Sequence, residues 1–224
     1  MLVSDQESLK TEGLAVPYVE LSFGVTGNTL PADHGYGLYS AIAHLCPAIH
    51  EQEGISILTI PGEPDRKGKI YLSSSSSLRI RLPYDAGKLS LVLPLAGQRI
   101  SIGQHSIQLN IPQIHPLQPT DKLRSRLVTI KKFQEPEPFE EAARRQLEAL
   151  GIEGHLFIPL NEQGQPSRKA LKIKSYSVVG FSVIVTDLSD EDSLKLQSFG
   201  LGGKHRMGCG VFTAFPRAWR FYDD

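Results

Sequence analysis

The sequence predicts an α+β protein made of two consecutive units that share one order of elements: strand, helix, strand, strand, helix, strand. Three observations support this prediction. Stretches in which apolar and polar residues alternate, as they do in strands, occur on both sides of residue 120. Each side also has two stretches with apolar residues at helical spacing. A proline-containing stretch, QIHPLQPTDK at 113–122, separates the two sides and has the composition of a linker.

The first unit combines a well-defined helix with several strands. The helix is expected at 36–50, because Leu38, Ile42 and Leu45 recur at helical spacing, and Asp33 is expected to cap its start. A linker that contains the run of serines at 73–77 interrupts the strands that follow. The other elements expected in this unit are strands at 18–25, 55–60, 78–83 and 98–112 and a weaker helix at 88–97.

The second unit contains the strongest helical signal of the chain, at 138–151, which is acidic at its start and is closed by Gly151. Another helix is expected from Ser189, its N-cap, onward. The order of elements is that of a ferredoxin-like (RRM-like) βαββαβ unit, so we expect two tandem domains, 1–120 and 121–224. The strands expected in the second unit are 126–132, 155–160, 170–176, 178–188 and 208–215.

Composition narrows the class of protein. A chain of 224 residues with 40% hydrophobic residues can bury a core. No run of eighteen uncharged apolar residues occurs and the first residues do not form a signal peptide, so we expect a cytoplasmic protein without a membrane span. Cys46 and Cys209 have no second cysteine pair with which to build a zinc site, and we expect two unpaired thiols.

Charge is unevenly distributed, although the net charge of the chain is zero. Residues 1–53 hold seven acidic residues and one lysine, whereas residues 122–174 hold eleven basic and seven acidic residues. A basic face in the second half suits a phosphate backbone. An ordinary solvated surface explains the same counts equally well.

A glycine-rich segment, SFGLGGKHRMGCGVF at 198–212, surrounds Lys204, His205 and Arg206. Glycines let backbone N–H groups approach phosphates, and the basic side chains neutralise them. The segment follows a helix and leads into a strand, so it is neither a Walker loop nor a dinucleotide fingerprint. A mobile hairpin loop is the alternative interpretation. The glycines of this segment are Gly200, Gly202, Gly203, Gly208 and Gly210.

Four of these glycines stand in the pattern Gly-x-Gly-x-x-x-x-x-Gly-x-Gly just before the last strand. In that place the pattern resembles the hallmark of the repeat-associated RNA-binding superfamily of CRISPR systems. The segment LPADHGYGLYSAIAHLCPAIHE at 30–51 is similar to the first helix of the repeat-processing endoribonucleases in that superfamily, particularly the branch first described from myxobacterial-type systems. The resemblance covers nearly the whole chain.

The resemblance implies a reaction and partners. A ribose 2′-hydroxyl attacks its own 3′ phosphodiester and leaves a cyclic phosphate and a 5′-hydroxyl, without a metal or other cofactor. The implied partners are the stem-loop of a CRISPR repeat RNA, the mature guide RNA and other subunits of an effector complex. Such chemistry needs a base and an acid, and histidine suits both because its ordinary pKa is about 6.5.

The resemblance favours His50, just past the first helix, as the general base. A surface histidine near the end of a helix is the alternative. His34 beside Asp33 is a candidate for a second acid–base group or for helix capping, and His44 lies where relatives carry a tyrosine. Tyr36 and Tyr39 are candidates for contact with the reacting phosphate or a base, with core packing as the alternative, favoured for Tyr39.

Relatives add a lysine a few residues past the catalytic histidine, whereas residues 51–54 here read Glu-Gln-Glu-Gly. The cation that stabilises the phosphorane is therefore open between Lys204 and Arg206. A non-catalytic RNA-binding subunit of the same superfamily and a ferredoxin-like metabolic or regulatory protein remain alternative functions. RNA contacts are expected from Arg124, Arg126, Lys131, Lys132, Arg168, Lys169, Lys172, Lys174, Gly200, Gly202, Gly203, Lys204, His205, Arg206, Gly208 and Gly210.

Overall fold

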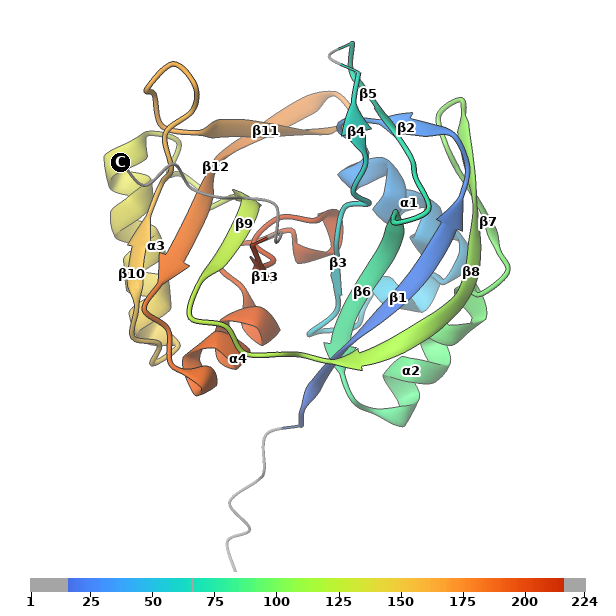
Figure 1. The fold of residues 1–224 in the computed structure, drawn as a ribbon, viewed down its shortest axis with the longest axis horizontal. Coiled ribbons are helices and arrows are strands. Elements are labelled where there is room, and N and C mark those ends of the chain that lie inside the picture. The colour runs from blue at the N-terminus through green and yellow to red at the C-terminus, as the bar shows by residue number, and fades with distance from the viewer. Residues whose placement is uncertain (1–15, 66, 216–224) are drawn as a thin grey trace, which may run out of the picture.

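The computed structural model describes residues 16–65 and 67–215. These residues form an α+β protein with four α-helices and three antiparallel sheets, arranged as two lobes side by side (Figure 1). The predicted α+β class is therefore confirmed. No helix in these residues is long and apolar enough to cross a membrane. The N-terminal residues on which the prediction of no signal peptide rests lie outside the described residues.

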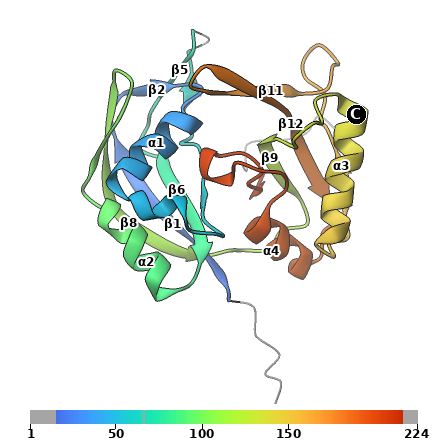
Figure 2. The same ribbon diagram turned by 180° about the vertical axis from the view of Figure 1, so that it is seen from behind.

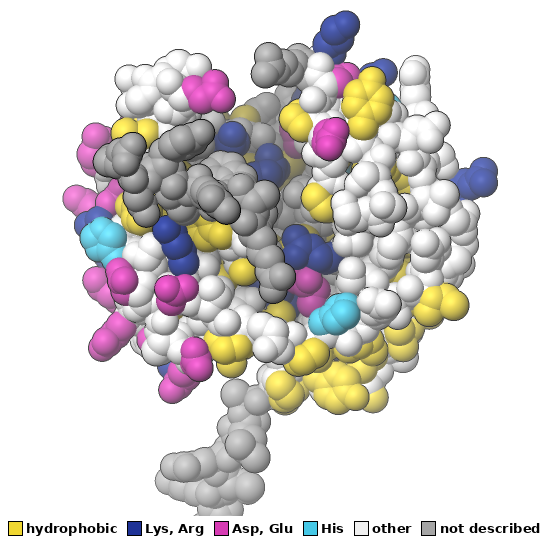
Figure 3. All heavy atoms as spheres, viewed as in Figure 1, with side chains coloured by type: hydrophobic (Ala, Val, Ile, Leu, Met, Phe, Trp, Pro, Cys, Tyr) yellow, Lys and Arg dark blue, Asp and Glu magenta, His cyan; other side chains and the backbone are white. Residues whose placement is uncertain are grey.

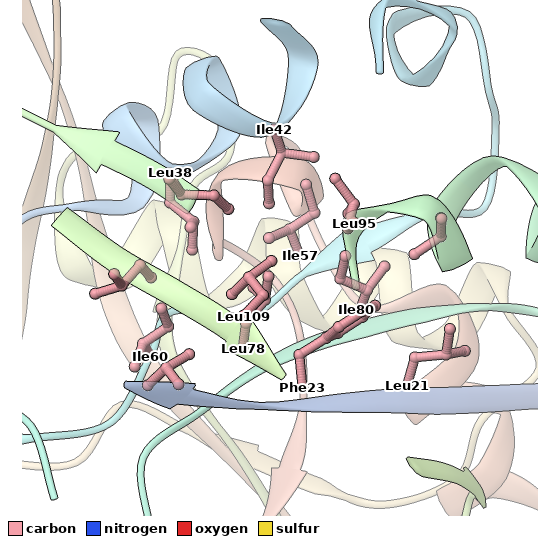
Figure 4. Close-up of a cluster of buried hydrophobic side chains, with 14 of the residues drawn as sticks. Leu21, Phe23, Leu38, Ile42, Ile57, Ile60, Leu78, Ile80, Leu95 and Leu109 are labelled. Carbon is pink, nitrogen blue, oxygen red and sulfur yellow. The ribbon is translucent and has the colours of Figure 1, made fainter. Parts of the chain in front are cut away.

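The first lobe contains a sheet with the strand order β3-β6-β1-β8-β7. Every second residue of β1 is buried, as its alternating sequence predicts, and Leu21 and Phe23 are fully covered. Leu38 and Ile42 of the first helix pack over the same face (Figure 4). The elements are β1 (Tyr18–Thr26), α1 (Gly35–Leu45), β3 (Ser56–Ile57), β6 (Ser77–Pro83), α2 (Ala86–Val92), β7 (Arg99–Ile102) and β8 (His105–Pro116).

The second lobe contains a sheet with the order β10-β12-β9-β13, and β11 also pairs with β12. Phe139 and Phe181 meet in its core with ring centroids 4.9 Å apart. Figure 2 shows that its long helix lies on the same side of the molecule as α1 and α2. The elements are β9 (Leu123–Val128), α3 (Pro136–Ala149), β10 (His155–Phe157), β11 (Arg168–Ile173), β12 (Tyr176–Thr186), α4 (Asp190–Phe199) and β13 (Thr213–Ala214).

A small third sheet stands where the sequence predicted a linker. It consists of β2 (Thr29–Pro31), β5 (Lys69–Tyr71) and β4 (Glu63–Pro64), in that order. The single strand expected at 98–112 is also a hairpin, because Gly103, at φ +60°, turns the chain between β7 and β8. Strand β8 then runs on to Pro116, into the predicted linker.

Several predicted boundaries move, and one predicted cap is wrong. The strands expected at 55–60 and 208–215 shrink to β3 and β13, and the one expected at 126–132 begins earlier, at Leu123. Asp33 does not cap α1, since its Oδ2 accepts a hydrogen bond from the backbone N–H of Lys172 at 2.8 Å. The cap predicted at Ser189 is confirmed, because its Oγ accepts from the Asp192 N–H at 3.1 Å.

Arg81 joins the two lobes. It lies on β6, its side chain is 2% exposed, and its Nη1 donates to the carbonyl oxygens of Gln197 and Phe212 in the second lobe at 2.6 and 2.8 Å. Its Nη2 forms an ion pair with Glu20 of β1 at 2.9 Å. A buried guanidinium bound in this way fixes the relative placement of the lobes, because separating them would leave a charge without its partners.

Candidate functional site

The predicted site residues come from two segments that lie against each other between the lobes. One is α1 with the short 3₁₀ helix η1 (Pro47–His50) that follows it. The other is the glycine loop, residues 200–210, which contains the 3₁₀ helix η3 (His205–Met207). They pack closely, since a Cβ on Gly35 at the start of α1 would lie 2.4 Å from the carbonyl oxygen of Met207.

The structure pairs His50 with Tyr39. The Tyr39 hydroxyl lies 2.5 Å from Nδ1 of His50, and the two rings meet edge to face with centroids 5.4 Å apart. His50 is exposed, whereas Tyr39 is half-buried against the core of the first lobe. This contact orients the imidazole through Nδ1 and leaves Nε2 to exchange a proton with a bound ligand, the arrangement that general acid–base catalysis requires.

Local sequence places His50 at this point. Helix α1 ends at Leu45 because Pro47 follows, and a residue just before a proline avoids the α conformation. Pro47 then starts η1, and the fully buried Ile49 anchors that turn in the core. His50 is therefore the last residue of a turn whose preceding residue cannot leave the core.

His34 is a buried structural residue rather than an available proton carrier. Its Nδ1 donates to the carbonyl of Pro31 at 2.8 Å, and its Nε2 accepts from the N–H of Ile60 at 2.9 Å. Burial lowers the pKa of His34, which favours this neutral form. It occupies the N-cap position of α1 but makes no side-chain capping bond. Both ring nitrogens are thus occupied by the backbone.

His44 and Tyr36 do not join the Tyr39–His50 pair. His44 is exposed and lies five residues beyond Tyr39, about 140° around the helix axis. His44 and Tyr36 line a separate hollow of about 510 Å³ between α1 and β7, together with Ser40 and Arg99. Tyr36 also packs against Leu171 and Cys209 of the second lobe.

The N–H groups of the five glycines in the loop are already occupied. The five glycine N–H groups donate to protein acceptors, and those of Gly202 and Gly210 donate to Gln146 Oε1 and the Leu127 carbonyl, each at 2.7 Å. The physical reason inferred from the sequence, that these N–H groups are exposed to cradle phosphates, is therefore corrected. The remaining donors pair Gly200 with Leu196, Gly203 with Thr129 and Gly208 with His205.

Crowding explains the glycines instead. A Cβ on Gly200 would lie 2.2 Å from the carbonyl oxygen of Gly210, and one on Gly202 would lie 2.4 Å from that of Thr129. A Cβ on Gly210 would lie 2.0 Å from the carbonyl oxygen of Leu201. These glycines also have positive φ, so the two ends of the loop approach each other only without side chains.

The basic residues at the tip of the loop differ in their surroundings. Lys204 is exposed. The ring of His205 is half-buried beneath Gly210, its Nε2 lies 3.3 Å from the Leu201 carbonyl, and burial lowers its pKa. Arg206 reaches into the first lobe, where its Nη1 donates to the carbonyl oxygens of Ile49, His50 and Gln52 at 2.5, 2.7 and 3.1 Å.

Three predicted lysines surround one hollow of about 790 Å³, which we call the lysine hollow. Lys131 and Lys132 enter it from the turn after β9, and Lys204 enters it from the glycine loop. Lys132 and Lys204 have φ of +75° and +65°, a conformation that non-glycine residues seldom adopt. Its other lining residues include no acid and are Thr129, Ile130, Gln134, Gln146, Ser177, Val178, Val179, Gly202 and Gly203.

A second basic hollow of about 330 Å³ lies between the lobes and is lined by Arg79, Arg124, Arg126 and Gly208; the described residues that line it include no acid. Figure 3 shows basic side chains gathered in the cleft between the lobes. The structure thus divides the predicted RNA-binding residues into groups. The remaining predicted basic residues, Arg168, Lys169, Lys172 and Lys174, are exposed on β11 and the turn after it and line neither hollow.

Within residues 16–65 and 67–215, no group of three or more histidine, cysteine, aspartate or glutamate side chains is placed to hold a metal ion. Cys46 and Cys209 are both buried and unpaired. Burial raises the pKa of the Cys209 thiol to about 11, so this side chain is an inert core residue.

Comparison with known proteins gives consistent matches. The family model described as Cas6 Crispr matches residues 19–217. The CRISPR-associated endonuclease Cas6 of Myxococcus xanthus (strain DK1622) is 35% identical over 208 residues, which cover 93% of this chain and 86% of that protein.

Solved structures agree in fold. A CRISPR-associated protein Cas6 superposes with a TM-score of 0.62 at 13% identity, over 89% of this chain and 99% of its own. A Cas6-related protein from Pyrococcus furiosus gives 0.59 at 17% identity, over 90% and 99%. A RAMP protein described as binding different RNA substrates gives 0.59 at 16% identity, over 89% and 100%.

Proposed function

The chain belongs to the Cas6 family of CRISPR-associated proteins, and on that premise we propose that it is a metal-independent endoribonuclease. Its substrate is the repeat hairpin of a CRISPR transcript, and its products are mature guide RNAs. The observation that supports catalysis most directly is the pair formed by Tyr39 and His50, in which an exposed imidazole is oriented through one ring nitrogen. A subunit that only binds RNA would not need such a pair.

The proposed reaction is an internal transesterification. The 2′-oxygen of the ribose forms a bond to the adjacent phosphorus, and the bond between phosphorus and the 5′-oxygen of the next nucleotide breaks. Nε2 of His50 takes the 2′ proton when Nδ1–H donates to the Tyr39 oxygen, the leaving 5′-oxygen takes a proton from solvent water, and the imidazolium returns its proton to solvent. The nucleophile is already tethered to its phosphate, so alignment and proton transfer are what the protein supplies.

RNA binding is assigned to two basic hollows on the second lobe and between the lobes. The lysine hollow offers three ammonium groups and no acidic side chain, and its apolar wall includes Val178 and Val179. The hollow between the lobes offers guanidinium groups, which bind phosphate oxygens in pairs. We assign the backbone of the repeat to these surfaces, and the exposed basic residues of β11 to a peripheral contact.

We also propose that the chain consists of two ferredoxin-like βαββαβ units, residues 1–120 and 121–224. The strand orders of the two large sheets support this division. The order β3-β6-β1-β8 in the first lobe corresponds to β10-β12-β9-β13 in the second, and in both it is the order expected for strands two, three, one and four of a βαββαβ unit. Two separate apolar cores, one within residues 19–109 and the other within residues 123–212, support it as well.

The decisive experiment incubates the purified protein with its cognate repeat RNA in EDTA. We expect complete cleavage, with a 2′,3′-cyclic phosphate on one product and a 5′-hydroxyl on the other. A repeat with one 2′-deoxy nucleotide at the cleavage site should bind normally and stay intact. Loss of cleavage on chelation, restored by magnesium or manganese, would overturn the proposed mechanism. Tight binding without cleavage of either RNA would identify a non-catalytic RNA-binding subunit.

A further inference from the structure

The glycine loop has two sides that contact different parts of the molecule. On one side, Gly202, Gly203 and Lys204 line the lysine hollow. On the other side, Arg206 extends into the first lobe and binds the backbone around His50. Two residues of one loop thus serve two surfaces. This division separates Lys204 and Arg206, which the sequence had treated as interchangeable cations.

The contact of Arg206 is specific in its geometry. One nitrogen, Nη1, lies within hydrogen-bonding distance of the carbonyl oxygens of Ile49, His50 and Gln52. Ile49 and His50 are the last two residues of η1 and Gln52 lies just beyond it, at a helix end where carbonyl oxygens have no partner within the helix and attract a cation. The turn is also closed by backbone hydrogen bonds from the Ile49 N–H to the Cys46 carbonyl at 3.1 Å and from the Glu51 N–H to the Ala48 carbonyl at 3.2 Å.

We propose that Arg206 is a positioning residue for His50. Its guanidinium holds the main chain from Ile49 to Gln52 in the one path that lets Nδ1 of His50 meet the Tyr39 hydroxyl. Ile49, anchored in the core, fixes the beginning of this path, and Arg206 fixes its end. This inference rests on the proposed role of His50 as the proton-transfer group.

The loop that carries Arg206 is itself rigid enough for this task. Its ends are joined by the hydrogen bond from the Leu201 N–H to the Gly210 carbonyl at 3.1 Å, and any Cβ on Gly210 would collide with the backbone. Because Arg206 is anchored on this loop, the position of the second lobe determines where the backbone of His50 is held in the first. The reacting group and its support therefore come from different lobes.

The test measures cleavage rate and RNA affinity separately for two variants two residues apart. Arg206→Ala should slow single-turnover cleavage at saturating protein by about 100-fold, the cost of a displacement of about 1 Å at a reacting group, while repeat affinity changes by less than about threefold. Lys204→Ala, on the other side of the loop, should weaken repeat affinity, the response that Arg206→Ala should not show. Millimolar guanidinium ion should restore part of the rate to Arg206→Ala.

Hydrogen exchange of the RNA-free protein gives an independent readout. Amides of residues 47–52 should exchange faster in Arg206→Ala, whereas those of α1 should not. Arg206→Lys keeps the charge but lacks the planar guanidinium, so it should cut at an intermediate rate.

Normal cleavage by Arg206→Ala at saturating protein would overturn the inference, even with His50→Ala inactive and the proposed function intact. A loss confined to affinity, with no response to guanidinium, would identify Arg206 as a phosphate contact and would also overturn it. If the wild-type protein fails to cut repeat RNA in any condition, the proposed function fails. Unchanged exchange at 47–52 then excludes the ordering role of Arg206 as well.

Discussion

The two lobes share their order of sheet strands but differ in the connections that follow their helices. After its first helix, the N-terminal lobe inserts the long connection 46–55, which carries His50, whereas the C-terminal lobe returns to its sheet through 150–154. After the second helix the relation is reversed, since 93–98 is short and 200–212, which contains the glycine loop, is long.

Each lobe therefore extends one connection, and the two extended connections meet where Arg206 binds the backbone of His50. The sheets and helices have matching orders in the two lobes, and the residues proposed for catalysis and for its support lie in the connections where the lobes differ. Substitutions at corresponding positions of the two lobes therefore test which segments carry the function.

The strongest test compares the two connections that follow the first helices. His50→Ala should slow single-turnover cleavage by about 10² to 10⁴-fold, because it removes the group proposed to transfer the proton. Glu153→Ala, an exposed change in the equivalent connection of the other lobe, should cut at the wild-type rate. His44→Ala is a second control on the far side of α1. Full activity of His50→Ala would contradict the proposal that the connection 46–55 carries the proton-transfer group.

Arg81 offers a comparison between contacts that join the lobes and contacts within one sheet. Arg81→Ala should lower the free energy of unfolding by about 3 kcal/mol, because Glu20 and two carbonyls of the other lobe lose their buried partner. Arg79→Ala removes a half-exposed ion pair to the same glutamate and should cost less than about 1 kcal/mol. Urea unfolding of the three proteins measures both values, and equal losses would contradict the role of Arg81 as a joint.

The lysine hollow can be compared with the exposed edge of the same lobe. Lys131→Ala combined with Lys132→Ala should weaken RNA binding by about tenfold and reduce the salt slope of log K by about 1.4, the value for two phosphate contacts on a single strand. The pair Lys169→Ala and Lys172→Ala on β11 should change both quantities by less. Anisotropy titrations at several salt concentrations measure both quantities for the two double variants. A larger effect of the β11 variant would indicate that the RNA binds along β11 instead of in the lysine hollow.

The smallest expected effect concerns two histidines, the buried His34 in the first lobe and the half-buried His205 in the second. Burial lowers the pKa of both His34 and His205, so the folded protein binds fewer protons than the unfolded chain. The free energy of unfolding should be at its full value above about pH 6.5 and should fall on acidification, by less than about 1.4 kcal/mol per pH unit for each histidine. His34→Asn and His205→Asn should each flatten the curve. Curves identical to wild type would show that these histidines titrate alike in both states.

Strong periodicity made much of the fold predictable. The alternation of β1, the amphipathic helix α3 and the capped helix α4 lie close to their predicted places. The third sheet was missed because β2, β4 and β5 are two or three residues long, too short to show a period. The hairpin at Gly103 was missed because the alternation continues through its turn.

The site was predictable in its parts rather than in its contacts. Resemblance pointed to His50, but nothing in the spacing of Tyr39 predicts that it meets that ring, and core packing was the favoured interpretation of this tyrosine. The glycine spacing predicted a special loop, although the crowding of its two ends, rather than open amides, accounts for it. The contact of Arg206 was invisible because its acceptors are carbonyls, which carry no sequence signal.

That dependence on carbonyls has an evolutionary consequence. Every amino acid supplies the same main-chain oxygen, so Arg206 holds the path of residues 49–52 whatever side chains they bear. Glu51, Gln52 and Glu53 are therefore free to be substituted through divergence without displacing the imidazole. The arginine itself has no such freedom, and a lineage that loses it must find another way to secure its histidine.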